Sequence, residues 1–206
     1  EISTPTVAAA LSAALLAQIT GAFHLDGLAD MADAFGGGWT QEQRLEILKD
    51  SRLGTYGVTA LIFVIIIEIA ALSALAGWLA VAATVAAHTA SRAVASFMMI
   101  IAKPARDSGL SVDYLTGLSR PAVIGASLLV TAGAITLFGV VALPLILGAY
   151  GAGALTVRLA INKIGGISGD VLGAIQQLAK VTILVIIVIA DDTTTDLGLL
   201  GGLALG

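Results

Sequence analysis

The strongest constraint on this fold is a series of apolar runs whose lengths suit helices that cross a lipid bilayer. A spanning helix needs about 20 mostly apolar residues. Six such runs occur, at residues 5–23, 57–77, 78–102, 121–143, 144–161 and 171–190. Of the 206 residues, 58% are hydrophobic and 12% are charged, whereas soluble proteins carry about 25% charged residues. Because a soluble protein of this size could not bury so much apolar surface, we predict an integral membrane protein.

The runs predict an all-α, single-domain membrane protein covering residues 1–206. We expect a bundle of about six transmembrane helices, with cytoplasmic loops and one amphipathic helix at the membrane surface. The joins at Gly77 and at Leu143 are tight, so each should form an antiparallel hairpin. The sequence begins with Glu1 rather than Met, so we also expect that an upstream segment is missing.

The basic residues predict which side of the membrane the loops face. Six spans place all three long connections on one side, and these connections carry the loop lysines and arginines. The set is Arg44, Lys49, Arg52, Lys103, Arg106, Arg120 and Lys163. The tight joins and the tail after residue 191 carry none. The positive-inside rule therefore predicts that the charged side is cytoplasmic.

Charge and cysteine content exclude several functions. The net charge is −4, which argues against nucleic acid as a partner. The absence of cysteine excludes disulfides, thiolate metal sites and cysteine nucleophiles. The lipid bilayer is the one partner that composition itself predicts, and homo-oligomerisation is left open.

Directly after the first run, three carboxylates fall on one face of a predicted helix. At ~100° per residue, Asp26, Asp30 and Asp33 lie within an arc of roughly 60°. Their mutual repulsion would be relieved by a cation, and oxygen ligands alone suit Mg²⁺ or Mn²⁺. The alternative is a solvated acidic helix end.

A short amphipathic helix is predicted next, capped by Thr40 with Gln43 as its reciprocal partner. Such a helix would lie along the membrane surface. Beyond it, Lys49, Asp50 and Arg52 precede a glycine-rich turn. Two cations beside a carboxylate-bound metal suit a diphosphate substrate, whereas the plain alternative is anchoring to lipid headgroups.

Charged residues also occur inside the spans. Glu68 and Lys180 lie ~16 Å and ~15 Å from the cytoplasmic ends of their spans, and Arg92 lies at similar depth. Unpaired charges are costly there, so we expect Glu68 to pair with Lys180 or Arg92. The alternative is a polar cavity that admits part of a substrate. His88 lies one turn from Arg92, where a helix–helix hydrogen bond or a proton relay is conceivable.

Two further connections carry candidate substrate ligands. Arg106 lies in a charged turn, and residues 165–170 form a glycine-rich loop that leads into the last span. The backbone amides of this loop, with Ser168 and Asp170, would suit a phosphate. Asp170 is an equally good N-cap.

Three stretches of the sequence resemble cobalamin synthase, the adenosylcobinamide-GDP ribazoletransferase family. They are HLDGLADMAD at residues 24–33, LEILKDSRLGTYG at 45–57 and GGISGDVLGA at 165–174. The first two, in this order and spacing, are specific. The resemblance covers about residues 21–180. Gln177 stands where we expect an acidic residue, which weakens the expectation that the last span supplies a metal ligand.

The resemblance implies a multi-pass transferase of the prokaryotic cytoplasmic (inner) membrane. It would join α-ribazole, or its 5′-phosphate, to adenosylcobinamide-GDP and release GMP, with Mg²⁺ required. In this interpretation the acidic face (Asp26, Asp30, Asp33) holds the metal. Lys49, Arg52 and Arg106 hold phosphates, and Asp33 or Asp50 takes the proton from the ribazole hydroxyl. His24, Arg92, Ser168 and Asp170 complete the predicted substrate contacts.

Two other functions compete with this interpretation. A CDP-alcohol phosphotransferase also begins its motif with Asp-Gly, two residues and Ala, as Asp26, Gly27 and Ala29 do here. However, Asp30 replaces the arginine that comes next in that family. An ion-coupled transporter would use the charges inside the spans, but transporters concentrate function at the midplane. Here most polar residues lie in the predicted cytoplasmic loops.

Overall fold

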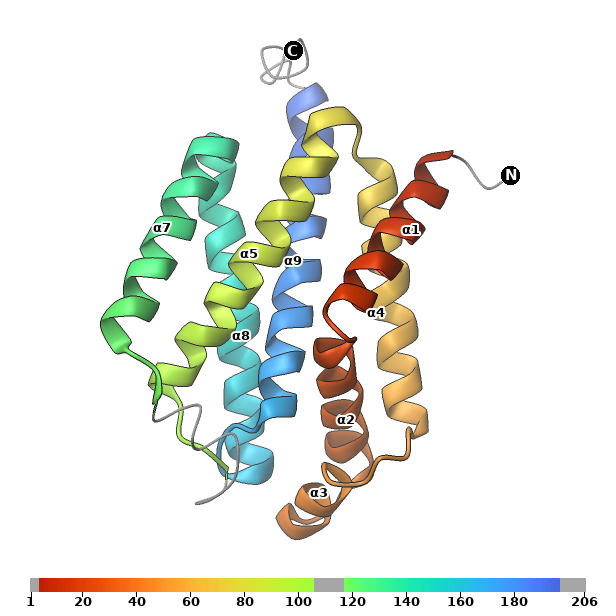
Figure 1. The fold of residues 1–206 in the computed structure, drawn as a ribbon, viewed down its shortest axis with the longest axis vertical. Helices are drawn as coiled ribbons and strands as arrows, with labels where there is room; N and C mark the ends of the chain where they lie inside the picture. The colour runs from red at the N-terminus through yellow and green to blue at the C-terminus, as the bar shows by residue number, and fades with distance from the viewer. Residues whose placement is uncertain (1–3, 106–116, 197–206) are drawn as a thin grey trace.

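The computed structural model describes residues 4–105 and 117–196, and its regular structure in that part of the chain is helical (Figure 1). The predicted all-α fold is therefore confirmed. The elements are α1 (Thr4–Ile19), α2 (Phe23–Gly37), α3 (Gln41–Ile47), α4 (Thr55–Ala74), α5 (Gly77–Ile101), α7 (Arg120–Phe138), the 3-10 turn η1 (Gly139–Val141), α8 (Ala142–Ile164) and α9 (Gly169–Asp196).

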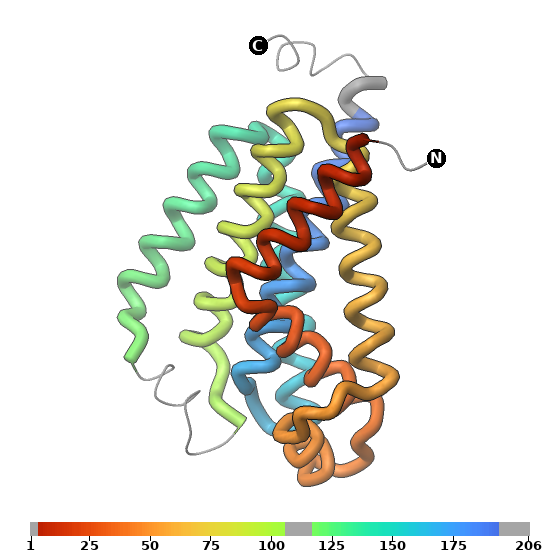
Figure 2. Tube along the Cα trace, turned by 45° about the vertical axis from the view of Figure 1, so that its right-hand side comes forward, coloured from red at the N-terminus to blue at the C-terminus, as the bar shows by residue number. Residues whose placement is uncertain are grey.

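Helix α9 is the centre of the bundle, and α2, α4, α5 and α8 all contact it. Its side chains supply much of the fully buried core, including Ile175, Ile183 and Leu184. Helix α7 lies at the periphery, beside α5 and α8 (Figures 1 and 2). Large aliphatic residues on the outer helices are exposed, as a lipid-facing surface requires.

The helices that correspond to the last five predicted runs are α4, α5, α7, α8 and α9. Of these, α4, α5 and α9 are each long and apolar enough to cross a membrane, and so is the stretch Arg120–Ile164, which folds back on itself at η1. The chain is a multi-pass membrane protein. Both predicted hairpins are present, because α4 with α5 and α7 with α8 lie antiparallel (Figure 1).

The first predicted span differs from the structure. Helix α1 has 16 residues, which gives a length of ~24 Å, less than the ~30 Å of a bilayer core. The chain then bends by 90° into α2. Gly21 and Ala22 both adopt left-handed backbone conformations at the bend. The hydroxyl of Thr20 donates to the carbonyl oxygens of Leu16 and Ala17, which also accept from the backbone N–H groups of Thr20 and Ala22 where the helix ends.

The described parts of the three charged connections lie at one end of the bundle, as predicted (Figures 1 and 2). The turns between α4 and α5 and between α7 and α8 lie at the opposite end (Figures 1 and 2). The predicted capping box is also confirmed. Thr40 accepts a hydrogen bond from the backbone N–H of Gln43, and the Gln43 side chain accepts one from the backbone of Thr40.

Helices α2 and α9 approach each other closely through two glycines. A β-carbon added at Gly27 would lie 2.8 Å from the backbone oxygen of Asp170, and one added at Gly173 would lie 3.2 Å from the α-carbon of Gly27. Because the neighbouring atoms are backbone, they cannot rotate away. This contact fixes the acidic face of α2 against the start of α9.

We predict that Gly27→Ala lowers the stability of the protein by roughly 1–3 kcal/mol, because the methyl group overpacks a backbone contact. Gly133→Ala is the matched control, since Gly133 lies inside α7 with nothing within 4 Å of an added β-carbon. The control should gain up to about 1 kcal/mol from helix propensity. Thermal unfolding in detergent measures both, and equal behaviour of the two variants would contradict the prediction.

Candidate active site

The acidic face predicted on α2 gains a fourth carboxylate from α9. Asp26 and Asp30 lie on α2, and Asp170 lies in the first turn of α9. The negative charge of Asp170 acts on Asp30. The glycine contact between the two helices produces this proximity. Sequence reasoning considered Asp170 only as a phosphate ligand or a cap, because local spacing says nothing about which helix lies opposite. The structure assigns the cap to Ser168, whose hydroxyl accepts from the backbone N–H of Val171.

The pKa of Asp30 reflects the negative charge on this face. Partial burial, followed by repulsion from Asp26, Asp170 and Asp33, raises the pKa of Asp30 from its ordinary 3.8 to about 6. A bound cation would remove this repulsion. The carboxylate oxygens present are the donors that Mg²⁺ prefers.

Asp33 has a structural role at the start of α4 that the sequence did not predict. Its side chain is 9% exposed, and its two oxygens accept hydrogen bonds from the backbone N–H groups of Gly54 (2.7 Å) and Gly57 (2.8 Å). Gly54 is the N-cap residue of α4 and Gly57 lies in its first turn, and α4 has no local side-chain cap. A β-carbon at either glycine would collide with the Asp33 carboxylate. Asp33 therefore caps α4 and fastens it to α2.

Because Asp33 is engaged with α4, fewer than three aspartates of α2 are left to bind a metal at this face. Within residues 4–105 and 117–196, no three His, Asp or Glu side chains are arranged to hold a metal ion by themselves. Mg²⁺ is usually bound by one or two carboxylates together with water and substrate phosphate. Asp26 and Asp30 fit that pattern, whereas the predicted role of Asp33 as ligand or base stays a prediction.

The cationic end of the first connection is exposed. Arg52 binds Asp50 through Nε, with 3.0 Å to each carboxylate oxygen, and through Nη2. These hydrogen bonds hold the pKa of Asp50 below its usual range. Asp50 is thus a weak base while this pair is formed. Lys49 is exposed beside the pair, so both cations are open to a phosphate that arrives from solution.

The three connections also bind one another. Ala105 and Ile167 form backbone hydrogen bonds that join the second connection to the glycine-rich loop, with the N–H of Ile167 donating to Lys103 at 2.9 Å. Arg44 donates to the carbonyl oxygen of Lys163, and the Lys163 ammonium donates to that of Phe35. Part of the loop is therefore held by backbone pairing. Its predicted phosphate contacts through Ser168 and Asp170 stay predictions, and Arg106 lies outside the described residues.

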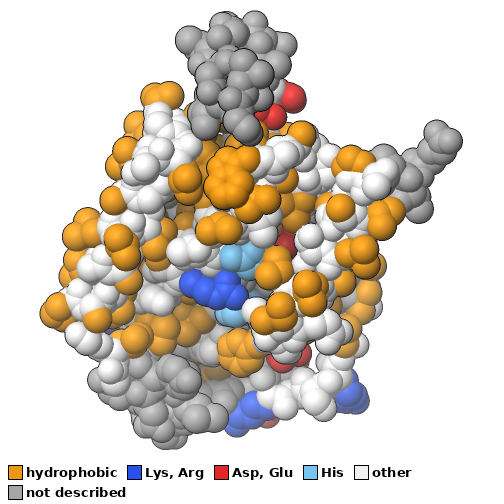
Figure 3. Space-filling model, turned by 45° about the horizontal axis from the view of Figure 1, so that its top comes forward, with side chains coloured by type: hydrophobic (Ala, Val, Ile, Leu, Met, Phe, Trp, Pro, Cys, Tyr) orange, Lys and Arg blue, Asp and Glu red, His pale blue; other side chains and the backbone are white. Residues whose placement is uncertain are grey.

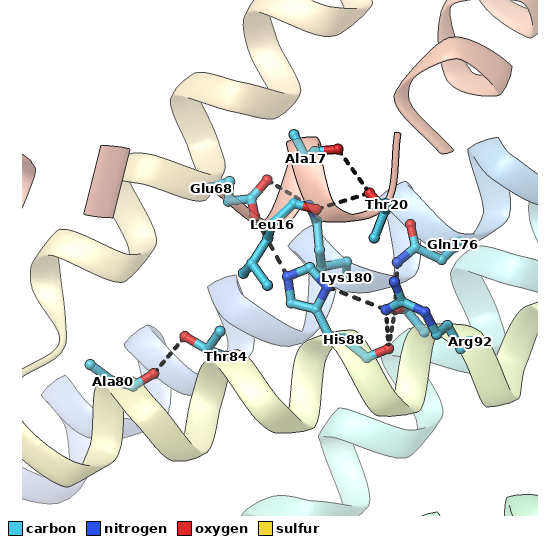
Figure 4. Close-up of polar contacts among 11 residues, drawn as sticks. Leu16, Ala17, Thr20, Glu68, Ala80, Thr84, His88, Arg92, Gln176 and Lys180 are labelled. Atoms are coloured by element: carbon cyan, nitrogen blue, oxygen red, sulfur yellow. Dashed lines mark hydrogen bonds and ion pairs between the residues drawn. The ribbon is translucent and has the colours of Figure 1, made fainter. Parts of the chain in front are cut away.

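Inside the bundle, Glu68 pairs with Lys180, one of its two expected partners. The Lys180 ammonium lies 2.6 Å from the Glu68 carboxylate (Figure 4). Both side chains are about 5% exposed. Arg92 instead donates to the backbone oxygen of His88 at 2.8 Å and contacts its ring Nδ1 at 3.3 Å. Gln176 donates to Ser91 and ties α9 to α5.

The polar cavity considered from the sequence is present as well. It has a volume of about 310 Å³, and Glu68, Arg92 and Lys180 line it. His24 reaches it from the start of α2, directly before the acidic face. In Figure 3, His side chains and a Lys or Arg side chain are visible in a hollow that hydrophobic side chains flank. The pairing and the cavity, which were alternatives in the sequence, therefore coexist.

We predict that Asp33→Asn lowers the stability of the protein by about 1–3 kcal/mol, because an amide N–H replaces one of two buried acceptors. Asp50→Asn changes a half-exposed carboxylate in a surface ion pair and should leave the melting temperature nearly unchanged. Thermal unfolding in detergent compares them. An Asp33→Asn protein that melts like the wild type but no longer binds Mg²⁺ would assign Asp33 to the metal instead.

Asp30→Asn should raise the melting temperature at pH 7.5 in EDTA and have no effect near pH 4. The folded-state pKa of Asp30 is raised, so ionisation costs folding free energy. This cost is absent below about pH 3.8 and complete above about pH 6. Melting curves at the two pH values measure the difference, and a stabilisation that does not depend on pH would refute the repulsion.

Comparison with known proteins identifies the family. A family model described as cobalamin-5-phosphate synthase matches residues 1–188. An adenosylcobinamide-GDP ribazoletransferase from Bradyrhizobium diazoefficiens is 44% identical over 190 residues, which cover 89% of this chain and 71% of that protein. A protein of the same name from Mesorhizobium japonicum is 40% identical over 197 residues, covering 90% and 71%. No solved structure matches the chain significantly. The chain therefore belongs to the cobalamin-5-phosphate synthase family of transferases.

Proposed function

We propose that this enzyme joins α-ribazole, or α-ribazole 5′-phosphate, to adenosylcobinamide-GDP and releases GMP. The observation that carries the proposal is the 44% identity to a protein named adenosylcobinamide-GDP ribazoletransferase, over 89% of this chain. The site supports this proposal independently, because acidic and basic side chains lie at the same end of a membrane bundle. Such a combination suits chemistry on a diphosphate.

In the proposed reaction, a ribazole hydroxyl oxygen attacks the phosphorus attached to the cobinamide. A new P–O bond forms there while the P–O bond to GMP breaks, and GMP leaves with the electron pair. The hydroxyl proton passes to a base at the site. Most of the catalytic effect would come from positioning the two substrates and neutralising charge on the phosphates.

Mg²⁺ (or Mn²⁺), when bound, would supply that neutralisation by coordinating phosphate oxygens. We assign Asp26 and Asp30 as its protein ligands, because these carboxylates share the strongest mutual repulsion. Asp33 would contribute by fixing α2 to α4, since both of its oxygens already accept hydrogen bonds.

Lys49, Arg52 and Arg106 are assigned to the substrate phosphates. Arg52 would exchange Asp50 for a phosphate, which would free the Asp50 carboxylate and let its pKa return toward the usual range. That exchange makes Asp50 the better candidate for the proton acceptor, whereas Asp33 would have to give up its hydrogen bonds to α4. Ser168 and Asp170 remain candidate contacts at the start of α9.

The enzyme would act at the cytoplasmic face of a prokaryotic inner membrane. The described connections that carry lysines and arginines lie at the end of the bundle toward which α2 runs (Figure 1), and the positive-inside rule favours a cytoplasmic position for that end. The names of the relatives favour this transferase over a CDP-alcohol phosphotransferase or an ion-coupled transporter.

The test is GMP release by the detergent-solubilised protein supplied with adenosylcobinamide-GDP and α-ribazole. We expect release that requires Mg²⁺ and α-ribazole and that falls by roughly 100-fold or more in Asp30→Asn. Glu46→Gln removes an exposed carboxylate from α3 and serves as the control of equal charge change. No release from folded protein under any condition would refute the proposed reaction.

A further inference from the structure

We propose that the cavity enclosed by α1, α2, α4, α5 and α9 binds the base and ribose of α-ribazole. This inference rests on the proposed function and assigns a place in the bundle to one of its two substrates. The cavity volume of about 310 Å³ falls at the lower end of the range of roughly 300–1,000 Å³ for small-molecule sites. A corrinoid is far larger than such a space, so the nucleoside is the substrate that fits.

One wall of the cavity is apolar. Helix α1 contributes four alanines and a leucine, and α4 contributes two isoleucines. These residues are Ala10, Ala13, Ala14, Leu16, Ala17, Ile65 and Ile69. A flat aromatic ring can lie against a surface of this kind over its whole face, which buries apolar area without forming specific polar contacts. The benzimidazole ring of α-ribazole is flat and apolar.

The opposite wall is polar and has hydrogen-bonding capacity to spare. The Oε1 atoms of Gln176 and Gln177 have no hydrogen-bond partner among the described residues, although these side chains are only 1% and 5% exposed. A buried acceptor without a partner is destabilising, so a ligand that donates to it is favoured. Ribose hydroxyls would supply donors after small rotations of the amides. Hydrocarbon lipid tails would not, so the polar wall favours a nucleoside over a lipid.

The charges of this wall suit a ligand without a large charge of its own. Glu68 and Lys180 neutralise each other (Figure 4). Arg92 is engaged with His88, and its guanidinium has further N–H groups to donate to a ring nitrogen or a ribose oxygen. The wall therefore offers both donors and acceptors.

Helix α2 contributes both to the cavity and to the acidic face. His24 lines the cavity, and Asp26 and Asp30 follow on the same helix, ~3 Å and ~9 Å further along its axis. A nucleoside held with its ribose beside His24 would lie within about two helical turns of the carboxylates that we assign to the metal. The attacking hydroxyl would then meet the diphosphate at the end of the bundle.

The test uses direct binding, which does not depend on turnover. Ala13→Leu adds volume inside the cavity, whereas Ala8→Leu makes the same change at an exposed position of α1 that does not line it. Equilibrium dialysis of α-ribazole against each full-length protein in detergent should give a Kd at least 10-fold higher for Ala13→Leu and an unchanged Kd for Ala8→Leu. Equal Kd values for both variants would overturn the inference.

Gln177→Leu provides a second measurement that separates binding from folding. It removes an amide whose oxygen has no partner, so the melting temperature should stay the same or rise. The Kd for α-ribazole should nevertheless rise about 10-fold. A Gln177→Leu protein that binds α-ribazole as tightly as the wild type would count against the polar wall as a ribose site.

Turnover then distinguishes the two proposals. In Ala13→Leu the KM for α-ribazole should rise while the KM for adenosylcobinamide-GDP stays unchanged, and the reverse pattern would assign the cavity to the corrinoid substrate and overturn the inference. If the wild type binds α-ribazole in the cavity but releases no GMP, the inference stands and the proposed reaction fails. If GMP is released but cavity variants bind α-ribazole normally, the reaction stands and the inference fails.

Discussion

The glycine contact between α2 and α9 is the constraint on which the site depends. Gly27 and Gly173 let two helix backbones approach so closely that a single β-carbon at Gly27 would strike Asp170. That approach brings Asp170 toward Asp30, whose pKa is raised by partial burial and then by repulsion from Asp26 and Asp170. It also places His24 beside the cavity, which residues of α9 line as well. Larger side chains at these positions would separate the acidic face from the last helix.

Features that depend on local sequence or on the bilayer could be predicted. The capping box of Thr40 and Gln43 follows from spacing alone. The ion pair of Glu68 with Lys180 follows from the cost of unpaired charge inside a membrane. The gathering of the charged connections at one end follows from the number of spans. Each of these arguments needs only the position of a residue along its own helix or its depth in the bilayer.

Features that depend on which helices meet could not be predicted. The helical spacing of Asp33 from Asp30 predicts a member of an acidic stripe, yet the Asp33 carboxylate caps α4 through the amides of Gly54 and Gly57. Hydropathy does not predict the early end of α1, because the run stays apolar through the left-handed residues Gly21 and Ala22. The glycines themselves were a signal, since Gly54 and Gly57 leave the space that Asp33 fills.

The proposed reaction gives a physical reason for a site that straddles the membrane boundary. An apolar base loses little by leaving water for a cavity among the helices, whereas a diphosphate and its metal need charged groups and access to solvent. The bend at Gly21 and Ala22 turns the chain from α1, which lines the cavity, into α2, which carries the carboxylates. A straight helix of the same length would carry the acidic residues along the axis of α1 and away from the start of α9. In the proposed reaction, the bend between α1 and α2 would therefore allow one continuous segment to serve both parts of the site.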